Sequence, residues 1–435
     1  MASAPRPVRT LMCLLAAAGV WVPSMHLLFR PRLEDWRLEA GARALPPRLA
    51  ELTHAQTAPW RDREDLPEDV VRMRIVNPEW DFMGRTFLVL ALANQALALP
   101  DLREGHLKVM DAVIRDTLET DEREGLYHFL MPYAHHGRWV ADPPRSIFVD
   151  GEIALMLGAR RLVEESAPWA AEMARRLDFA EAAMRQSPLL VAESYPDECW
   201  MFCNAVAIAA MAMAEALEPA GRDGFIREWL DTVRAHLVDE ETGLLWSTFT
   251  TDGGFDQGPE GSSIWMAAHM LDLADPAFAR DQYDRARREL GRALFGFGYA
   301  TEWPRGGPKH PDVDSGAVLP ILNLSPASSG LAFVGAGGFG DDRWLRQLLT
   351  SLRYGGFPAR EDGGIRFRAS NQVGDAVLLY GLSAGPLWDE VRARRSDRGR
   401  ATDPMTASPE PLSLADSVER PPQDGGDGAA ASPTP

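Results

Sequence analysis

The strongest constraint on the fold of this chain is a series of paired helical patterns between about residues 80 and 395. Within it, apolar residues recur at i, i+3, i+4 and i+7, the spacing that buries one face of an α-helix. We predict six helix pairs, at 83–99 and 104–119, 150–165 and 167–187, 202–217 and 221–237, 262–273 and 276–294, 315–336 and 341–354, and 370–383 and 385–395. Linkers inside a pair are short, such as LADPA, whereas linkers between pairs are long and rich in glycine, proline, aromatic and charged residues.

A helix pair of this kind cannot bury its apolar face alone and needs neighbours on both sides. Six such units are the number that closes the array into a ring, so the sequence predicts an all-α (α/α)6 barrel over residues 77–395. Because long and short linkers alternate, all the long ones lie at one mouth of the barrel. Binding and catalysis concentrate on loops that a rigid scaffold holds, so we expect the functional site at this mouth.

Both ends of the chain differ from the barrel in composition. Residues 10–29 carry no formal charge and are flanked by arginines on both sides. Their length fits one membrane span, and no small-x-small cleavage site follows, which favours an uncleaved anchor over a signal peptide. We assign 1–32 as an N-terminal transmembrane anchor or signal segment, 33–76 as a connecting segment and the polar 396–435 as a disordered tail. The protein is therefore expected to be membrane-anchored, and an extracytoplasmic catalytic domain is one option.

Charge and motif content exclude several classes of function. The net charge of −18 argues against a nucleic-acid partner. Three cysteines cannot build a disulfide framework, and the CxxxC of YPDECWMFCN has no second Cys or His pair at the distance of a zinc site. No phosphate-binding loop, dinucleotide fingerprint or GxSxG elbow is present. We therefore expect neither a metal nor a cofactor, and a homo-oligomer is left open.

Three segments place carboxyl groups where a loop enters a helix. YPDECWMFCN (195–204) holds Asp197, which is either a helix N-cap or a catalytic group. FVDGEIALMLG (148–158) holds Glu152, which either stabilises a helix N-terminus or is an acid whose pKa rises in an apolar mouth. HPDVDSGAVLPIL (310–322) holds Asp314, which is an N-cap, a substrate ligand or a general base. Cysteines in such a helix are equally compatible with apolar packing.

The stretch from about residue 194 to 288 resembles the linalool dehydratase/isomerase family. The resemblance rests on PDECWMFCNAVA, on REWLDTVRAHLVDEETGLLW, on a Gly-rich segment leading to Trp265 and on DPAFARDQY. Upstream, FVDGEIALMLGARRLV matches in pattern and NPEWDFMGRTFLVLALAN matches more weakly, so that the likeness covers roughly 77–395.

The resemblance implies an (α/α)6 barrel that adds or removes water at tertiary isoprenoid alcohols and isomerises allylic alcohols without a cofactor. By the resemblance, Cys203 falls on one of two active-site cysteines, Ser194 on the other, Glu152 on an active-site histidine and Trp265 on a pocket tryptophan. Glutamate in place of histidine keeps a proton-transfer group, whereas serine in place of cysteine removes a group that ionises near pH 8.5. The family's N-terminal active-site aspartate and tyrosine have no match in this chain.

We predict a lyase or isomerase that acts on a small apolar alcohol or alkene, in the area of terpene metabolism. Its predicted catalytic residues are Glu152, Cys203, Asp197, Ser194 and Asp314, and its predicted substrate contacts are Phe148, Tyr195, Trp200, Asn204, Trp246, Trp265 and His135. Two alternatives stay open. One is a carbohydrate-active (α/α)6 enzyme, a glycoside hydrolase or epimerase, that uses Asp314 with Glu152 or Asp256. The other is a non-catalytic binding module at a membrane.

Overall fold

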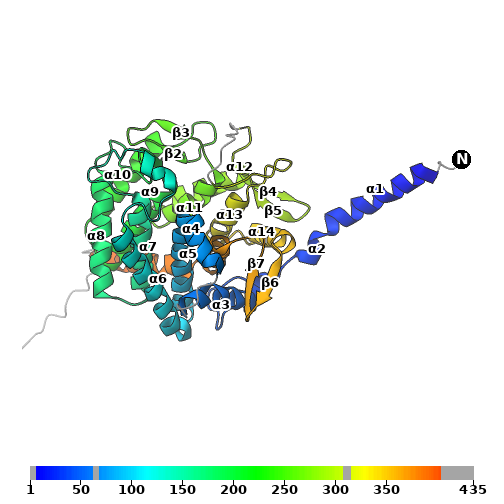
Figure 1. Ribbon diagram of the computed structural model, residues 1–435, viewed down its shortest axis with the longest axis horizontal. Coiled ribbons are helices and arrows are strands. Elements are labelled where there is room, and N and C mark those ends of the chain that lie inside the picture. The colour runs from blue at the N-terminus through cyan, green and yellow to red at the C-terminus, as the bar shows by residue number, and fades with distance from the viewer. Residues whose placement is uncertain (1–5, 62–67, 307–314, 403–435) are drawn as a thin grey trace, which may run out of the picture. The chain divides into compact units, whose positions relative to one another are not determined.

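The computed structural model describes residues 6–61, 68–306 and 315–402, and its body is a ring of six inner helices (Figure 1). The inner helices are α5 (Pro78–Ala98), α7 (Ile147–Val163), α9 (Met201–Leu217), α11 (Gly261–Leu271), α13 (Pro326–Gly338) and α15 (Gln372–Ser383). Each packs against the next one along the chain, and α15 packs against α5. This closure confirms the predicted (α/α)6 barrel.

The second helix of each pair lies outside the ring and is amphipathic. The outer helices are α6 (Arg103–Glu124), α8 (Ala167–Met184), α10 (Asp223–His236), α12 (Pro276–Glu289), α14 (Asp342–Gly355) and α16 (Pro386–Thr402). Every residue of the inner helix α9 is buried, whereas α10 buries one stripe that contains Phe225, Trp229 and Val233. The helical period of apolar residues therefore distinguishes the two layers correctly.

Side-chain caps fix where several inner helices begin. Asn77 accepts a hydrogen bond from the Trp80 amide at 2.9 Å, and Pro78 takes the first helical position. Ser325 and Asn371 cap α13 and α15 in the same way. These caps satisfy amides that have no partner inside the helix, and they hold the helix N-termini around one mouth.

Short antiparallel strands lie in the linkers between the helices of the barrel. β1 (Cys199–Trp200), β2 (Thr248–Phe249) and β3 (Phe255–Gln257) form one sheet, with Cys199 paired to Phe249. β4 (Gly291–Leu294) pairs with β5 (Phe297–Ala300), and β6 (Pro358–Glu361) pairs with β7 (Gly364–Phe367).

The N-terminal part of the chain precedes the barrel as α1 (Arg6–Ser24), α2 (His26–Phe29), α3 (Pro47–Arg61) and α4 (Glu68–Val76). Short 3-10 helices occur at Leu33–Asp35, Pro100–Leu102 and Pro132–His136. Among the described residues, the stretch Arg6–Asp35 is the one helical segment long and apolar enough to cross a membrane, and none of its most apolar window is buried. That property suits either a membrane anchor or a signal sequence. Helix α2 packs against α14, and α3 packs against α15, α6 and β7.

Several predicted helix boundaries are wrong. Helix α6 runs to Glu124 and α16 to Thr402, beyond the predicted 119 and 395, so that 396–402 are helical and do not belong to a disordered tail. Three other boundaries differ for local reasons. The helix predicted to start at 315 begins at Pro326, because 315–325 form a loop with a Leu319–Leu324 bridge and a left-handed Asn323. The helix predicted to reach 294 ends at Glu289, because β4 turns into β5 there. Helix α5 starts at Pro78, earlier than predicted, through its Asn77 cap. Asp314 and most of the predicted disordered tail lie outside the described residues.

Candidate active site

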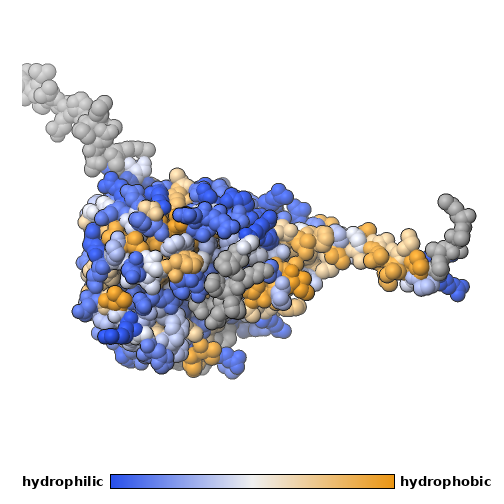
Figure 2. All heavy atoms as spheres, turned by 90° about the horizontal axis from the view of Figure 1, so that it is seen from above, coloured by the Kyte–Doolittle hydropathy of each residue, from blue (hydrophilic) through white to orange (hydrophobic). Residues whose placement is uncertain are grey.

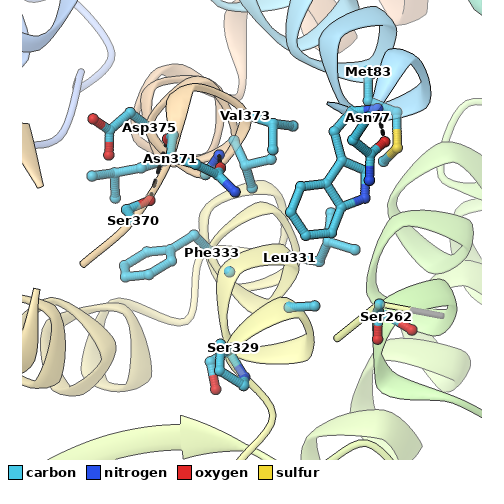
Figure 3. A pocket seen from close by; sticks show the side chains of 18 of the residues that line it. Asn77, Met83, Ser262, Ser329, Leu331, Phe333, Ser370, Asn371, Val373 and Asp375 are labelled. Atoms are coloured by element: carbon cyan, nitrogen blue, oxygen red, sulfur yellow. Dashed lines mark hydrogen bonds between the residues drawn. The ribbon is translucent and has the colours of Figure 1, made fainter. Parts of the chain in front are cut away.

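A cavity of about 840 Å³ lies at the mouth of the barrel, among the N-terminal ends of the inner helices. Figure 3 shows Met83 of α5, Ser262 of α11, Phe333 of α13 and Val373 of α15 facing this space. Its wall is mainly apolar, and its volume is in the usual range for small-molecule pockets. The long linkers thus converge at one mouth as the alternation of linker lengths predicts.

Glu152 is the most unusual ionisable group next to this cavity. It lies on α7, one helical turn beyond the cavity-lining Phe148, and only 1% of it is exposed. The pKa of the Glu152 carboxyl is raised to about 8, mainly by burial; the Thr86 hydroxyl opposes the shift and the nearby charge of Glu79 adds to it. Within the described chain, neither carboxyl oxygen has a well-aligned hydrogen-bond partner. Glu152 is therefore a buried carboxylic acid that is largely protonated at neutral pH.

Cys203 connects Glu152 to the cavity. It lies in the first turn of α9 and lines the cavity. Burial raises the pKa of the Cys203 thiol well above its usual range; the Ser194 hydroxyl opposes this effect, and the charges of Glu152 and Glu79 add to it. Cys203 is thus a neutral thiol, which can donate a hydrogen bond but is a poor base. The structure brings Glu152, Cys203 and Ser194 together, as the sequence predicted.

Ser194 is fully buried behind Cys203. Its hydroxyl accepts a hydrogen bond from the Trp200 amide at 3.2 Å, and its carbonyl accepts one from Ser146 at 2.7 Å. These contacts link the loop before α9 to the start of α7. Ser194 therefore ties the N-terminus of α9 to that of α7, the two helices that carry Cys203 and Glu152.

Glu79 and Tyr195 form a second polar group in the cavity wall. The Tyr195 hydroxyl donates a short hydrogen bond to Glu79 and accepts one from the Met131 amide at 3.2 Å. Burial and the charge of Glu79 both raise the pKa of Tyr195, so that it remains a phenol. Tyr133 stacks on Tyr195 with ring centroids 4.8 Å apart. Sequence reasoning missed Glu79, although the NPE of NPEWDF is a recognisable helix start that puts Glu79 at the mouth.

Two further predicted contacts line the cavity, and others do not. Phe148 and Trp200 are part of its wall. Asn204 is absent from the wall and holds the backbone of Ala192, through hydrogen bonds of 2.9 and 3.0 Å. Trp265 belongs to the core, where its indole donates to Ser328 at 3.1 Å.

Trp246, His135 and Asp197 lie outside the cavity wall as well. Trp246 packs edge-on against Phe255, and His135 stacks on Tyr127 in an exposed loop. Asp197 is exposed and has φ of 59°, the left-handed conformation of a turn. The predicted N-cap role for Asp197 is wrong, because α9 begins only at Met201 with Trp200 as its N-cap residue. The short strand β1 intervenes, so Cys199 and Cys203 do not share one helix face.

Among the described residues, no group of three or more His, Cys, Asp or Glu side chains is arranged to hold a metal ion. The cavity wall contains two more carboxyl side chains, those of Glu260 and Asp375. The Asp375 carboxylate accepts a hydrogen bond from the Phe367 amide at 3.3 Å. Together with Glu79, these groups add carboxyl side chains to an otherwise mainly apolar wall.

No protein-family model matches the chain. The fold is similar to that of several solved structures. An unsaturated glucuronyl hydrolase from Bacillus shows 14% identity over 68% of this chain and 84% of its own, with a TM-score of 0.45. The cellobiose 2-epimerase from Bacillus thermoamylovorans shows 11% identity over 69% and 87%, with a TM-score of 0.45. Dfg5 from Chaetomium thermophilum, in complex with glucosamine, shows 12% identity over 79% and 90%, with a TM-score of 0.48.

Proposed function

We propose that this protein is a membrane-anchored enzyme of the linalool dehydratase/isomerase type, which dehydrates, hydrates or isomerises a small apolar alcohol or alkene by acid–base chemistry. The observation that carries the proposal is Glu152. A carboxylic acid with a pKa of about 8, without an aligned partner and next to an apolar cavity, is matched to proton transfer near neutral pH.

Glu152 acts as the general acid in this proposal. In the dehydration direction it gives its proton to the substrate hydroxyl, the carbon–oxygen bond breaks, and water leaves with the bonding electron pair. The carboxylate formed is then stabilised by the Thr86 hydroxyl, which favours the ionised form. Glu152 is buried and does not itself line the cavity, so proton transfer requires the substrate hydroxyl to approach it past the cavity-lining Phe148 and Cys203.

A base must then remove a proton from the carbon next to the cationic centre. The raised pKa of Cys203 argues against a thiolate base, so we assign the thiol to hydrogen bonding with the substrate oxygen. Glu79 is the better base, because it lines the cavity and is oriented by the Tyr195 hydroxyl. The electron pair of the broken carbon–hydrogen bond forms the alkene. Catalysis by this scheme uses a proton donor and an acceptor on different inner helices.

The aromatic wall suits a short-lived cation. Phe148, Trp200 and Tyr195 line the cavity, and the faces of such rings attract positive charge. The apolar surroundings exclude water, which would otherwise trap the cation at the wrong carbon. An apolar alcohol gains binding energy from the same surroundings.

The test is product analysis with a panel of tertiary and allylic isoprenoid alcohols, using the full-length protein in mild detergent. The expected result is water loss or allylic rearrangement by the wild type and a loss of at least about 100-fold with Glu152→Gln. Tyr133→Phe, which leaves the Glu79–Tyr195 hydrogen bond in place, is the matched control and should keep most activity. Turnover unchanged by Glu152→Gln would remove Glu152 from the mechanism.

A carbohydrate-active function is the second candidate, and the carboxyl groups of the wall favour it. Glu79, Glu260 and Asp375 line the cavity beside Trp80 and Trp200, which is a composition that suits sugar binding. Adding disaccharides and unsaturated uronides to the same panel separates the two candidates. Binding or cleavage of a glycan, together with indifference to isoprenoid alcohols, would favour this second function.

A further inference from the structure

Apolar side chains that face solvent gather around α2, where the N-terminal helix joins the barrel. We name these residues the base patch: Leu27 and Leu28 of α2, Leu294 and Phe295 at the β4–β5 turn, and Tyr354 and Phe357 around the end of α14. Their exposed fractions range from 43% for Leu294 to 69% for Leu28. Figure 2 shows hydrophobic residues continuing from the N-terminal helix onto the body that it joins. Soluble proteins rarely expose large groups of such residues together.

Ring contacts join the elements that carry the base patch. Phe29 packs edge-on against Tyr354 with centroids 5.1 Å apart, and Phe297 lies 5.3 Å from Tyr354 and 6.4 Å from His26. The Arg353 guanidinium donates a hydrogen bond to the Phe29 carbonyl at 2.6 Å. Helix α2, the β4–β5 hairpin and the end of α14 therefore form one packed unit.

The elements that carry the base patch also form one wall of the cavity. Along α14, Leu348, Ser351 and Leu352 line the cavity, while Tyr354 contacts α2. Along β5, Gly298 lines the cavity and its neighbour Phe297 contacts His26. A single layer of structure thus separates the base patch from the cavity.

A second exposed apolar segment lies at the cavity mouth, in the loop before α13. Leu319, Ile321 and Leu322 are 54%, 94% and 40% exposed, and Leu319 also lines the cavity. A bridge between Thr301 and Leu324 ties this loop to the end of β5. Such exposure of aliphatic side chains is unfavourable in water.

We propose that the base patch and the loop at 319–322 dock on a lipid bilayer, so that the cavity faces the apolar phase and its substrate enters from the membrane. This inference rests on the membrane anchor of the proposed function. Only Met25 separates α1 from α2, so a barrel held by α1 cannot stand away from the bilayer. Arg30 and Arg32, both exposed, follow α2 at the level where lipid headgroups would lie.

The test measures lipid contact at single fluorescent labels on the full-length protein, in phosphatidylcholine–phosphatidylglycerol vesicles that contain a nitroxide-labelled lipid. Native Cys13 reports whether α1 is in the bilayer. In a Cys13→Ser background, labels at Phe295→Cys and Phe357→Cys report whether the base patch contacts lipid. Two positions are used so that a local folding defect at one of them does not decide the result. Ala174→Cys, exposed on α8, is the matched control on another face of the barrel.

We expect strong quenching at Cys13 and at both base-patch positions, at least about fivefold stronger than at Ala174→Cys. Quenching at Cys13 without quenching at either base-patch position would overturn the docking proposal and leave the anchor standing. Absence of quenching at every position would overturn both. Protection of the base-patch labels from aqueous iodide without lipid quenching would show that a protein, a second copy included, covers the patch, and it would also overturn the proposal. Substrate turnover is measured separately, so failure of the proposed chemistry does not alter these results.

Discussion

Glu152 on α7 and Cys203 on α9 lie close enough that the carboxyl group raises the pKa of the thiol. The thiol lines the cavity, and the acid lies behind it with no aligned hydrogen-bond partner among the described residues. Burying a carboxyl group in this way is costly unless it stays protonated. An acid that is kept neutral next to an apolar cavity has a clear use in proton transfer, whereas it adds nothing to stability.

The cost of burying Glu152 should appear in the pH dependence of stability. Its folded-state pKa of about 8 is above the unfolded value, so the folded state binds the extra proton and stability falls as pH rises between the two pKa values. We predict that Glu152→Gln gains at least about 2 kcal/mol relative to the wild type between pH 5 and pH 8. Denaturant unfolding of both proteins at the two pH values measures this difference. A difference that does not change with pH would contradict the raised pKa.

The two buried cysteines should be unreactive in the folded protein. Cys199 and Cys203 are buried and have raised pKa values. At neutral pH we expect a maleimide to modify both thiols at least about 100 times more slowly in the folded protein than after denaturation. Mass spectrometry of timed digests measures the rates. Rapid labelling of Cys203 in the folded protein would restore a thiolate as the candidate base.

Tyr195 should matter for both stability and catalysis. Tyr195→Phe leaves the Met131 amide and the Glu79 carboxylate without the hydroxyl that connects them. We predict a loss of about 1–3 kcal/mol in the free energy of unfolding and a loss of about tenfold in turnover. Tyr133→Phe keeps the ring that stacks on Tyr195 and is the matched comparison. Equal effects of the two substitutions would argue against a specific role for the Tyr195 hydroxyl.

Asn204 is a structural residue, so its substitution should lower stability without lowering the activity of the folded protein. Its side chain makes hydrogen bonds to the amide and carbonyl of Ala192 and to the Trp200 carbonyl. We predict that Asn204→Ala lowers the free energy of unfolding by about 3 kcal/mol, because it leaves buried backbone groups unpaired. Activity per folded molecule, measured at low temperature, should stay near that of the wild type. A stable but inactive Asn204→Ala would place Asn204 in the active site instead.

The barrel could be predicted because the spacing of apolar residues along each helix shows which of its faces is buried. Boundaries that depend on long-range pairing could not be predicted. Cys199 and Trp200 form a strand only because Thr248 and Phe249 lie opposite them, and Leu294 belongs to a strand because of Phe297. Neither partner is visible from the local pattern, so the sequence does not reveal β1, and the helix predicted over 276–294 extends too far, past Glu289.

The candidate site could be predicted in part, for a similar reason. Glu152, Cys203 and Ser194 are found together because all three lie at the start of an inner helix or directly before it. Trp265 lies in the first turns of α11 as well, yet its ring turns into the core against Trp344. The direction of a side chain within a helix turn depends on tertiary packing, which the position in the chain does not reveal. Glu79 was missed because α5 was expected to start after it.

The central claim is that protonated Glu152 supplies the proton in turnover of an isoprenoid alcohol. The decisive measurement is the pH dependence of kcat/KM for the best alcohol of the panel, with the wild type and with Glu152→Asp. The wild type should be active at neutral pH and lose activity tenfold per pH unit above about pH 8, as the carboxyl group ionises. The shorter side chain of Glu152→Asp should shift the pH at which activity is lost and lower the maximal kcat/KM. A wild-type profile that is flat through pH 8, or one that Glu152→Asp leaves unchanged, would contradict the assignment of Glu152 as the acid.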